Sequence, residues 1–218
     1  YLAFACACAA LVDISYLISI LTGSHLCMSV MSSVYFITID FMLLGLLAFT
    51  LHFIKGRFSK TTRRLMILGN AYALFELVVF ALNPFLGIAI DYVPRNAEIA
   101  RYAYQMKPLY ICHLVFSYVL VGTVIFLLVW KLCRVPREYR KQYLFVIVGI
   151  LAIVAVNAVF LFCHTDAIWD QLDYSICGYS LTSYLLYWSC FNYSSHGMLN
   201  TLKTSIFESI GQGIVLFD

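Results

Sequence analysis

The sequence predicts an all-α fold, a polytopic bundle of transmembrane helices. Of its 218 residues, 63% are hydrophobic and only 11% are charged, whereas a soluble domain carries about 25% charged residues. A soluble core could not bury this much apolar surface, so we expect lipid to cover much of it. The Lys and Arg residues gather between long apolar runs and are nearly absent within them. The net charge of +3 is too small to indicate a nucleic-acid partner.

Six apolar runs are each long enough to cross about 30 Å of hydrocarbon as a helix that rises about 1.5 Å per residue. They do not alternate apolar with polar residues, which favours helices over the strands of a β-barrel. The runs occupy residues 1–22, 29–54, 65–84, 108–132, 142–163 and 173–191. We therefore expect one transmembrane domain over residues 1–191.

The connections between the runs predict an orientation in the membrane. The segments 55–64 and 131–141 each hold five Lys or Arg residues, and cytoplasmic connections are enriched in these residues. The connections 23–28 and 164–172 hold no Lys or Arg, and the longer connection 85–107 is mixed. Because the two kinds alternate, one orientation satisfies all five and places both ends of the chain on the cytoplasmic side.

Most of the eight cysteines lie inside apolar runs, where Cys behaves as a small hydrophobic residue. They form no CxxC pair and no close Cys/His set with zinc spacing. Cys163 and Cys177 fall near the same predicted membrane face, so a disulfide between them stays open.

The last residues, 192–218, are more polar than the rest. Residues 203–210 are predicted as a short helix, Gly211 to Gly213 as a turn, and residues 214–217 as the start of a strand. We expect a cytoplasmic linker that leads into a further domain.

Four segments occur in an order and spacing typical of one protein family. Asn83-Pro-Phe-Leu-Gly87 closes the third run, and Tyr110–Tyr118 is an aromatic helix start that contains a His. A basic connection, Arg134–Gln142, is followed by a helix with Asn157, and Thr204–Asp218 ends the chain. Together they resemble the N-terminal seven-helix sensor region of bacterial histidine kinases and related diguanylate cyclases.

The resemblance implies several expectations. It implies seven helices, the first of which would precede Tyr1, and a junction in residues 192–218 to a PAS-like or catalytic output domain. It also implies a multi-pass protein of the bacterial inner membrane, with a cytoplasmic C-terminus and a homodimeric state. Any catalysis is expected in the output domain, a histidine kinase or a diguanylate cyclase. The chain itself has no nucleophile or phosphate-loop motif, and no cofactor is predicted.

Ionisable residues inside the apolar runs are the candidate functional groups, because each costs at least about 2.5 kcal/mol at the centre of a membrane helix. Helical spacing places Tyr72 and Asn83 on the face of Glu76, and Tyr110 and Ser117 on the face of His113. The predicted ligand-binding residues are Asp40, Glu76, His113, Asn157, Tyr72, Asn83, Tyr110 and Ser117.

Three interpretations of these groups stay open. They line an outward-facing pocket for a small cationic or amphipathic ligand, which tyrosine rings would assist through cation–π contacts. Alternatively, they form interhelical hydrogen bonds that hold the bundle together, or they line a proton or ion path. No fixed ligand spacing is present, so the sequence predicts no metal site.

The predicted function is that of a membrane receptor module, which senses a small ligand and passes a signal inward. A transporter or channel is the alternative, although no internal repeat is evident. A structural assembly subunit is the third possibility.

Overall fold

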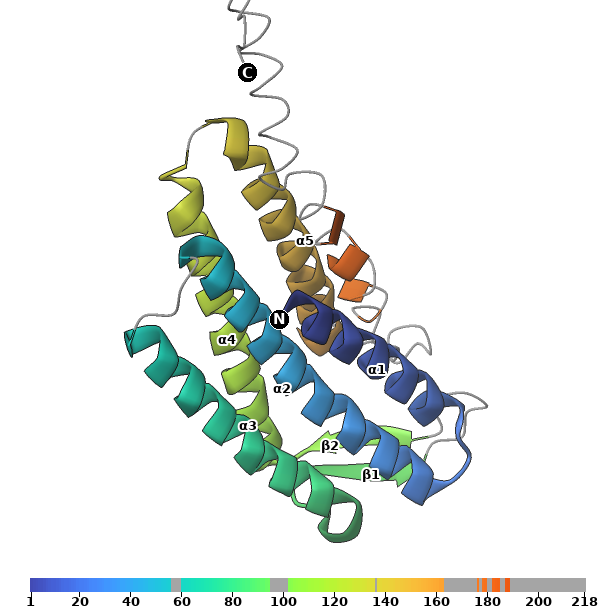
Figure 1. Ribbon diagram of the computed structural model, residues 1–218. Helices are drawn as coiled ribbons and strands as arrows, with labels where there is room; N and C mark the ends of the chain where they lie inside the picture. Colours follow the sequence, from blue (N-terminus) through green and yellow to red (C-terminus); the bar gives the residue numbers. More distant parts are fainter. Residues whose placement is uncertain are drawn as a thin grey trace, which may run out of the picture.

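The computed structural model describes residues 1–55, 60–94, 102–135 and 137–162, together with eight residues between 176 and 188. Within these ranges the chain forms five long helices and one two-stranded sheet (Figure 1). In chain order they are α1 (Leu2–Leu21), α2 (His25–Lys55), α3 (Lys60–Leu86), β1 (Ile90–Pro94), β2 (Tyr102–Met106), α4 (Pro108–Leu132) and α5 (Arg137–Phe162). The predicted all-α helical bundle is confirmed.

Helix α2 is the centre of this bundle. It packs against α1, α3 and α4, while α5 packs against α4. In its most apolar stretch, 72% of the residues of α2 are buried, compared with 22% in α3 and in α4. A side chain on α2 can therefore meet side chains from both α3 and α4.

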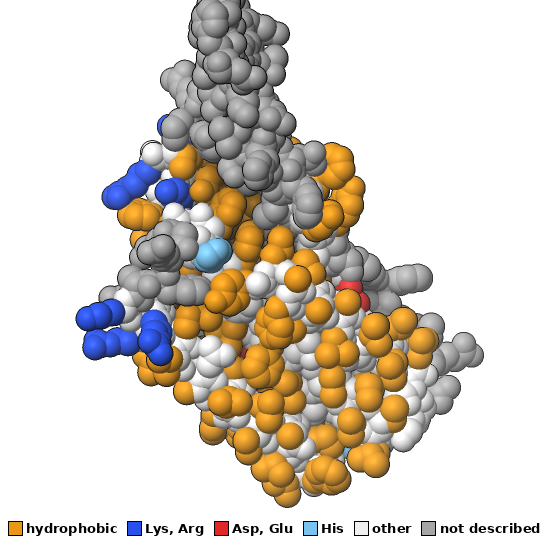
Figure 2. All heavy atoms as spheres, viewed as in Figure 1, with side chains coloured by type: hydrophobic (Ala, Val, Ile, Leu, Met, Phe, Trp, Pro, Cys, Tyr) orange, Lys and Arg blue, Asp and Glu red, His pale blue; other side chains and the backbone are white. Residues whose placement is uncertain are grey.

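Four of the described helices, α1 to α4, are long and apolar enough to cross a membrane, and α5 contains a shorter apolar stretch, Tyr143–Val159. Their outer faces carry large apolar side chains that nothing in the bundle covers (Figure 2). Examples are Phe4, Leu17, Ile67, Leu68, Val78, Val119, Phe126, Phe145 and Val148. Apolar exposure on this scale marks a surface that faces lipid, and the chain is a multi-pass membrane protein.

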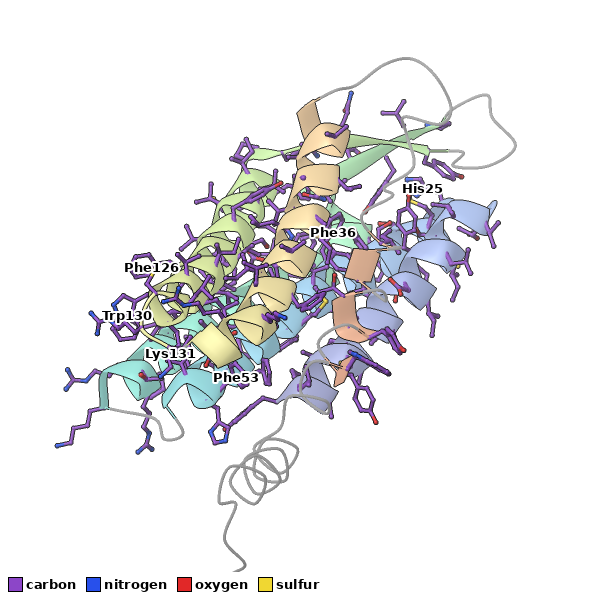
Figure 3. The ribbon with its side chains drawn as sticks, turned by 90° about the horizontal axis from the view of Figure 1, so that it is seen from above. His25, Phe36, Phe53, Phe126, Trp130 and Lys131 are labelled. Atoms are coloured by element: carbon purple, nitrogen blue, oxygen red, sulfur yellow. The ribbon has the colours of Figure 1, made fainter. Side chains whose placement is uncertain are left out.

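Basic side chains gather at one end of the bundle, which we call the basic end (Figure 2). They lie at the start of α3, the end of α4 and the start of α5. The described members are Lys60, Arg63, Arg64, Lys131, Arg134, Arg140 and Lys141. Figure 3 shows Lys131 and Phe53 at this end and His25 at the opposite end.

A β-hairpin covers the opposite end, which we call the hairpin end (Figure 1). Its strands β1 and β2 pair antiparallel, from Ile90 opposite Met106 to Pro94 opposite Tyr102. The ring of His25, at the start of α2, contacts Tyr102 with ring centroids 5.4 Å apart. This hairpin was not predicted, because residues 85–107 show no clear apolar alternation.

The turn from α3 into the hairpin is built around Asn83. Its Nδ2 donates to the carbonyl of Ile90 (3.1 Å), and its Oδ1 accepts from the backbone N–H groups of Ala89 (2.8 Å) and Ile90 (3.0 Å). Gly87 follows with φ of 55°, a left-handed conformation that glycine adopts without steric cost. Helix α3 ends at Leu86, two residues beyond Pro84.

Three helices begin before the predicted apolar runs, because the residues that precede these runs continue the helices. Helix α2 begins at residue 25 rather than 29, α3 at 60 rather than 65, and α5 at 137 rather than 142. Of the sixth predicted run, 173–191, only eight residues are described, and these are helical. The predictions for residues 192–218 and for Cys163 and Cys177 lie outside the described residues.

Candidate functional site: a buried carboxylate and histidine cluster

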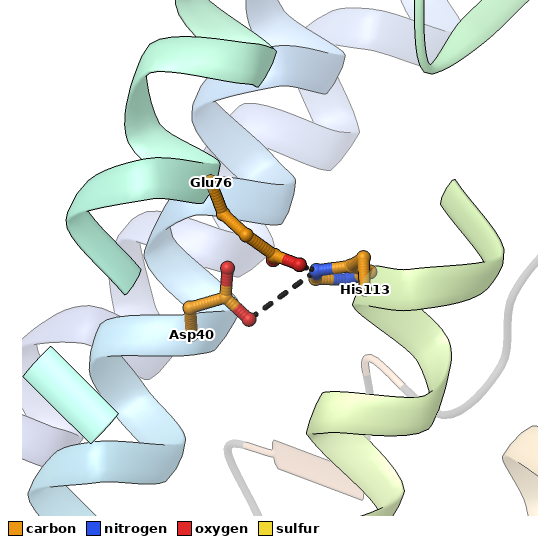
Figure 4. Close-up of side chains that lie close together, drawn as sticks. All are labelled: Asp40, Glu76 and His113. Carbon is orange, nitrogen blue, oxygen red and sulfur yellow. Dashed lines mark hydrogen bonds and ion pairs between the residues drawn. The ribbon is translucent and has the colours of Figure 1, made fainter. Parts of the chain in front are cut away.

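Three ionisable side chains from three different helices meet inside the bundle (Figure 4). Nδ1 of His113 on α4 lies 2.7 Å from Oε2 of Glu76 on α3. The same nitrogen lies 3.3 Å from Oδ1 of Asp40 on α2. One ligand atom from each residue lies within 4.8 Å of the other two. We call these three residues the Asp40–Glu76–His113 cluster.

The cluster is enclosed by protein. The exposed fractions of Asp40, Glu76 and His113 are 1%, 2% and 3%. Charged groups in such surroundings must be paired or neutralised, because burial removes their hydration. An added charge would therefore change the protonation and pairing of these two acids and one imidazole.

Aromatic rings surround the imidazole of His113. The ring of Phe80 lies 5.2 Å from it and the ring of Phe36 lies 5.4 Å from it, both nearly perpendicular. Tyr110, one helical turn before His113, lies 5.8 Å away and nearly parallel. These rings fix the orientation of the imidazole and keep the site apolar on one side.

Helical periodicity explains how the chain brings these groups inward. On α3, Glu76 shares its buried face with Ala73, Phe80 and Asn83, which lie three, four and seven positions away. On α4, His113 shares its buried face with Tyr110. Other helices enclose α2 on most sides, so Asp40 is buried without belonging to a single apolar face.

Asp40 is the incompletely satisfied member of the cluster. Within the described part of the chain, neither of its carboxylate oxygens has a hydrogen-bond donor. Its close charged neighbour is the His113 nitrogen, which already contacts Glu76 at shorter distance. The hydroxyl of Ser117, one turn after His113, is likewise buried without a hydrogen bond among the described residues.

The other predicted site residues contact different parts of the bundle. Tyr72 lies one turn before Glu76 on α3, and its ring packs 4.1 Å from that of Phe116 on α4. Tyr110 packs against His113, as described above. Asn157 on α5 accepts a hydrogen bond from the hydroxyl of Tyr118 (2.7 Å), which joins α4 to α5.

The role of Asn83 is different from a ligand contact, because its side chain holds the turn into the hairpin. Phe36 and Phe80, by contrast, contact His113 and were not among the predicted site residues. Each lies four positions from an acid, Phe36 before Asp40 and Phe80 after Glu76, so the same helical spacing could have found them.

The fold and the cluster define a class: a polytopic membrane helix bundle with ionisable groups buried between three of its helices. Two carboxylates and one imidazole nitrogen can exchange protons or hold a cation. They lie among apolar helices.

Comparison with known proteins identifies the family. Residues 1–197 match the family described as the N-terminal 7TM region of histidine kinase. The chain belongs to this family, and it is a membrane sensor module of that kind. Comparisons with curated proteins and with solved structures gave no match.

Proposed function

We propose that this region senses a small ligand at the Asp40–Glu76–His113 cluster and transmits the binding event to a cytoplasmic output domain. The observation that supports this proposal is the meeting of α2, α3 and α4 at one buried, incompletely paired set of charges. The family suggests a histidine kinase as the output domain, and a diguanylate cyclase is the other enzyme that we weigh.

The cluster suits a ligand with a cationic group. Two acids face one imidazole, so a bound cation balances charge that the protein alone leaves unbalanced. The ligand must favour one helix packing over another, since equal affinity for both would shift nothing. In the described conformation the cluster is enclosed, so entry requires α2, α3 and α4 to separate locally.

The orientation that we propose lets such a signal pass from the outside of the membrane to the cytoplasm. Lys and Arg are enriched on the cytoplasmic side of membrane proteins, which assigns the basic end to the cytoplasm and the hairpin end to the outside. His113 lies five residues after Pro108 at the hairpin end of α4, about 7.5 Å along the helix. A ligand from outside would reach the cluster first, and the helices would transmit the change to the basic end.

The test uses the full-length protein that carries this region, reconstituted in proteoliposomes. We expect Asp40→Asn, Glu76→Gln and His113→Gln each to change basal output activity at least about threefold, because each alters the balance of packings. Asn70→Ala is the matched control: Asn70 lies on α3, is exposed, and bonds the carbonyl of Met66 in its own helix.

Unchanged output in all three cluster variants, with normal folding, would end the proposal. Flux of protons or cations through the wild-type protein, lost in the same variants, would instead favour the transporter alternative.

A further inference from the structure

We propose that the Asp40–Glu76–His113 cluster binds one divalent transition-metal ion. This inference deepens the proposed function, because it names the chemical class of the ligand: a metal cation of the Zn²⁺ or Mn²⁺ type. The ion would be held by one carboxylate oxygen from each acid and by Nδ1 of His113 (Figure 4).

The distances from His113 Nδ1 to the two carboxylates are near those of such an ion. Zn²⁺ binds carboxylate oxygen and imidazole nitrogen at about 2.0–2.1 Å, so neighbouring ligands of a tetrahedral site lie about 3.3 Å apart. Asp40 Oδ1 already lies 3.3 Å from His113 Nδ1. Glu76 Oε2 lies 2.7 Å from that nitrogen and would move by about 0.6 Å, within the reach of a rotation about its side-chain bonds. Three protein ligands leave one coordination position for water or another group.

The charges of the cluster also match those of a divalent ion. Two ionised carboxylates carry two negative charges, and a divalent ion with a neutral imidazole brings the total to zero. Electroneutrality matters here because the cluster is buried among apolar helices, where unbalanced charge is costly. A monovalent ion would leave one negative charge in place.

The unsatisfied carboxylate of Asp40 is a second, independent observation. It is 1% exposed and points toward the other two residues (Figure 4). Within the described part of the chain, neither of its oxygens receives a hydrogen bond. Buried polar atoms are nearly always satisfied, and Oδ1 has only its 3.3 Å ion-pair contact with the His113 nitrogen, so these oxygens indicate a ligand that accepts their lone pairs.

The ligand types favour a transition metal over Ca²⁺ or Mg²⁺. Ca²⁺ takes six to eight oxygen ligands and Mg²⁺ keeps several waters in an octahedron, whereas the aromatic rings of Phe36, Phe80 and Tyr110 leave one side of this site apolar. Imidazole nitrogen suits Zn²⁺ and its neighbours, and mixed nitrogen and carboxylate ligands also suit Mn²⁺.

The test measures binding directly in the full-length protein, purified in nanodiscs and stripped with a chelator. Titration with ZnCl₂ and with MnCl₂ is expected to give one bound ion per chain, and CaCl₂ at the same concentration is expected to give none. Co²⁺ loaded in place of Zn²⁺ is expected to show visible d–d absorption typical of a four-coordinate site. Asp40→Asn and His113→Gln should each weaken binding by more than about 100-fold, since even outer-shell changes cost about 10–100-fold.

His25→Gln is the matched control, because it removes an imidazole at the hairpin end and leaves the cluster intact. It should retain one ion per chain. Thermal unfolding of each apo variant checks that the fold persists, and Glu76→Asp, which keeps the charge, should retain weaker binding.

Absence of stoichiometric Zn²⁺ or Mn²⁺ binding by the wild-type protein, or undiminished binding by the Asp40 and His113 variants, overturns the metal proposal. The sensor proposal is judged separately by output activity. If the wild-type protein binds metal but the variants leave output unchanged, the metal site stands and its signalling role is rejected. If the variants alter output but the wild-type protein binds no metal, the sensor proposal stands and the metal proposal is rejected.

Discussion

The Nδ1 atom of His113 lies 2.7 Å from Oε2 of Glu76, and this contact joins α4 to α3 inside the bundle. Both helices also pack on α2, where Asp40 completes the cluster. One side chain thus contacts acids from two different helices, so a change at this point affects the packing of all three.

Removal of one partner of this contact should destabilise the bundle. Glu76→Gln or His113→Gln leaves a buried group without its partner, which costs about 3–5 kcal/mol. The double variant should lose less than the sum of the two single losses, because the two residues share one interaction. Unfolding of the purified protein in detergent measures this, and strict additivity would show that the contact carries no energy.

Asn83→Ala should destabilise the turn between α3 and the hairpin. The substitution removes three hydrogen bonds and leaves the buried N–H groups of Ala89 and Ile90 without their acceptor, at about 1–3 kcal/mol for each unsatisfied group. Asn70→Ala removes one exposed bond within α3 and should change stability by less than about 0.5 kcal/mol. Equal losses in the two variants would contradict the role of Asn83 in the turn.

Gly87→Ala should cost about 1–2 kcal/mol, because an alanine at φ of 55° brings its Cβ too close to the backbone. Gly122 on α4 has a helical backbone and open space where a Cβ would lie, so Gly122→Ala should be neutral or stabilising. Thermal unfolding of both variants compares them. A neutral Gly87→Ala would show that this turn relaxes easily.

The orientation is testable by cysteine labelling in intact cells, in a background without native cysteines. Val93→Cys in β1 is exposed at the hairpin end and should react with a membrane-impermeant thiol reagent. Arg63→Cys at the basic end should react only after the membrane is permeabilised. Labelling of Arg63→Cys from outside would reverse the proposed topology and remove the inward signal with it.

The helices of this protein could be predicted because apolar length is a strong signal in a membrane chain. The cost of ionisable groups in hydrocarbon also singled out Asp40, Glu76 and His113 before any geometry was known. The sequence left open whether they line one pocket or form interhelical hydrogen bonds, and spacing alone could not give their mutual contacts, since these depend on α2 lying between α3 and α4. For the same reason a metal site was not predicted, as its ligands come from three separate helices.

Asn83 shows the opposite difficulty. Its position on the face of Glu76 and the end of the helix near Asn83-Pro84 were predicted, but its hydrogen bonds to the backbone of residues 89 and 90 depend on the hairpin, which was not. The hairpin itself was missed because its strands are only five residues long and carry mixed polarity.

A distance measurement at the basic end tests whether the Asp40–Glu76–His113 cluster controls helix packing. Spin labels at Arg63→Cys on α3 and at the exposed Cys133 after α4, with the other cysteines replaced, report the separation of these two helices in the full-length protein. We expect His113→Gln to shift the distance distribution between the labels, whereas Asn70→Ala should leave it as in the wild-type protein. Identical distributions in all three proteins would contradict the claim that the cluster controls helix packing at the cytoplasmic side.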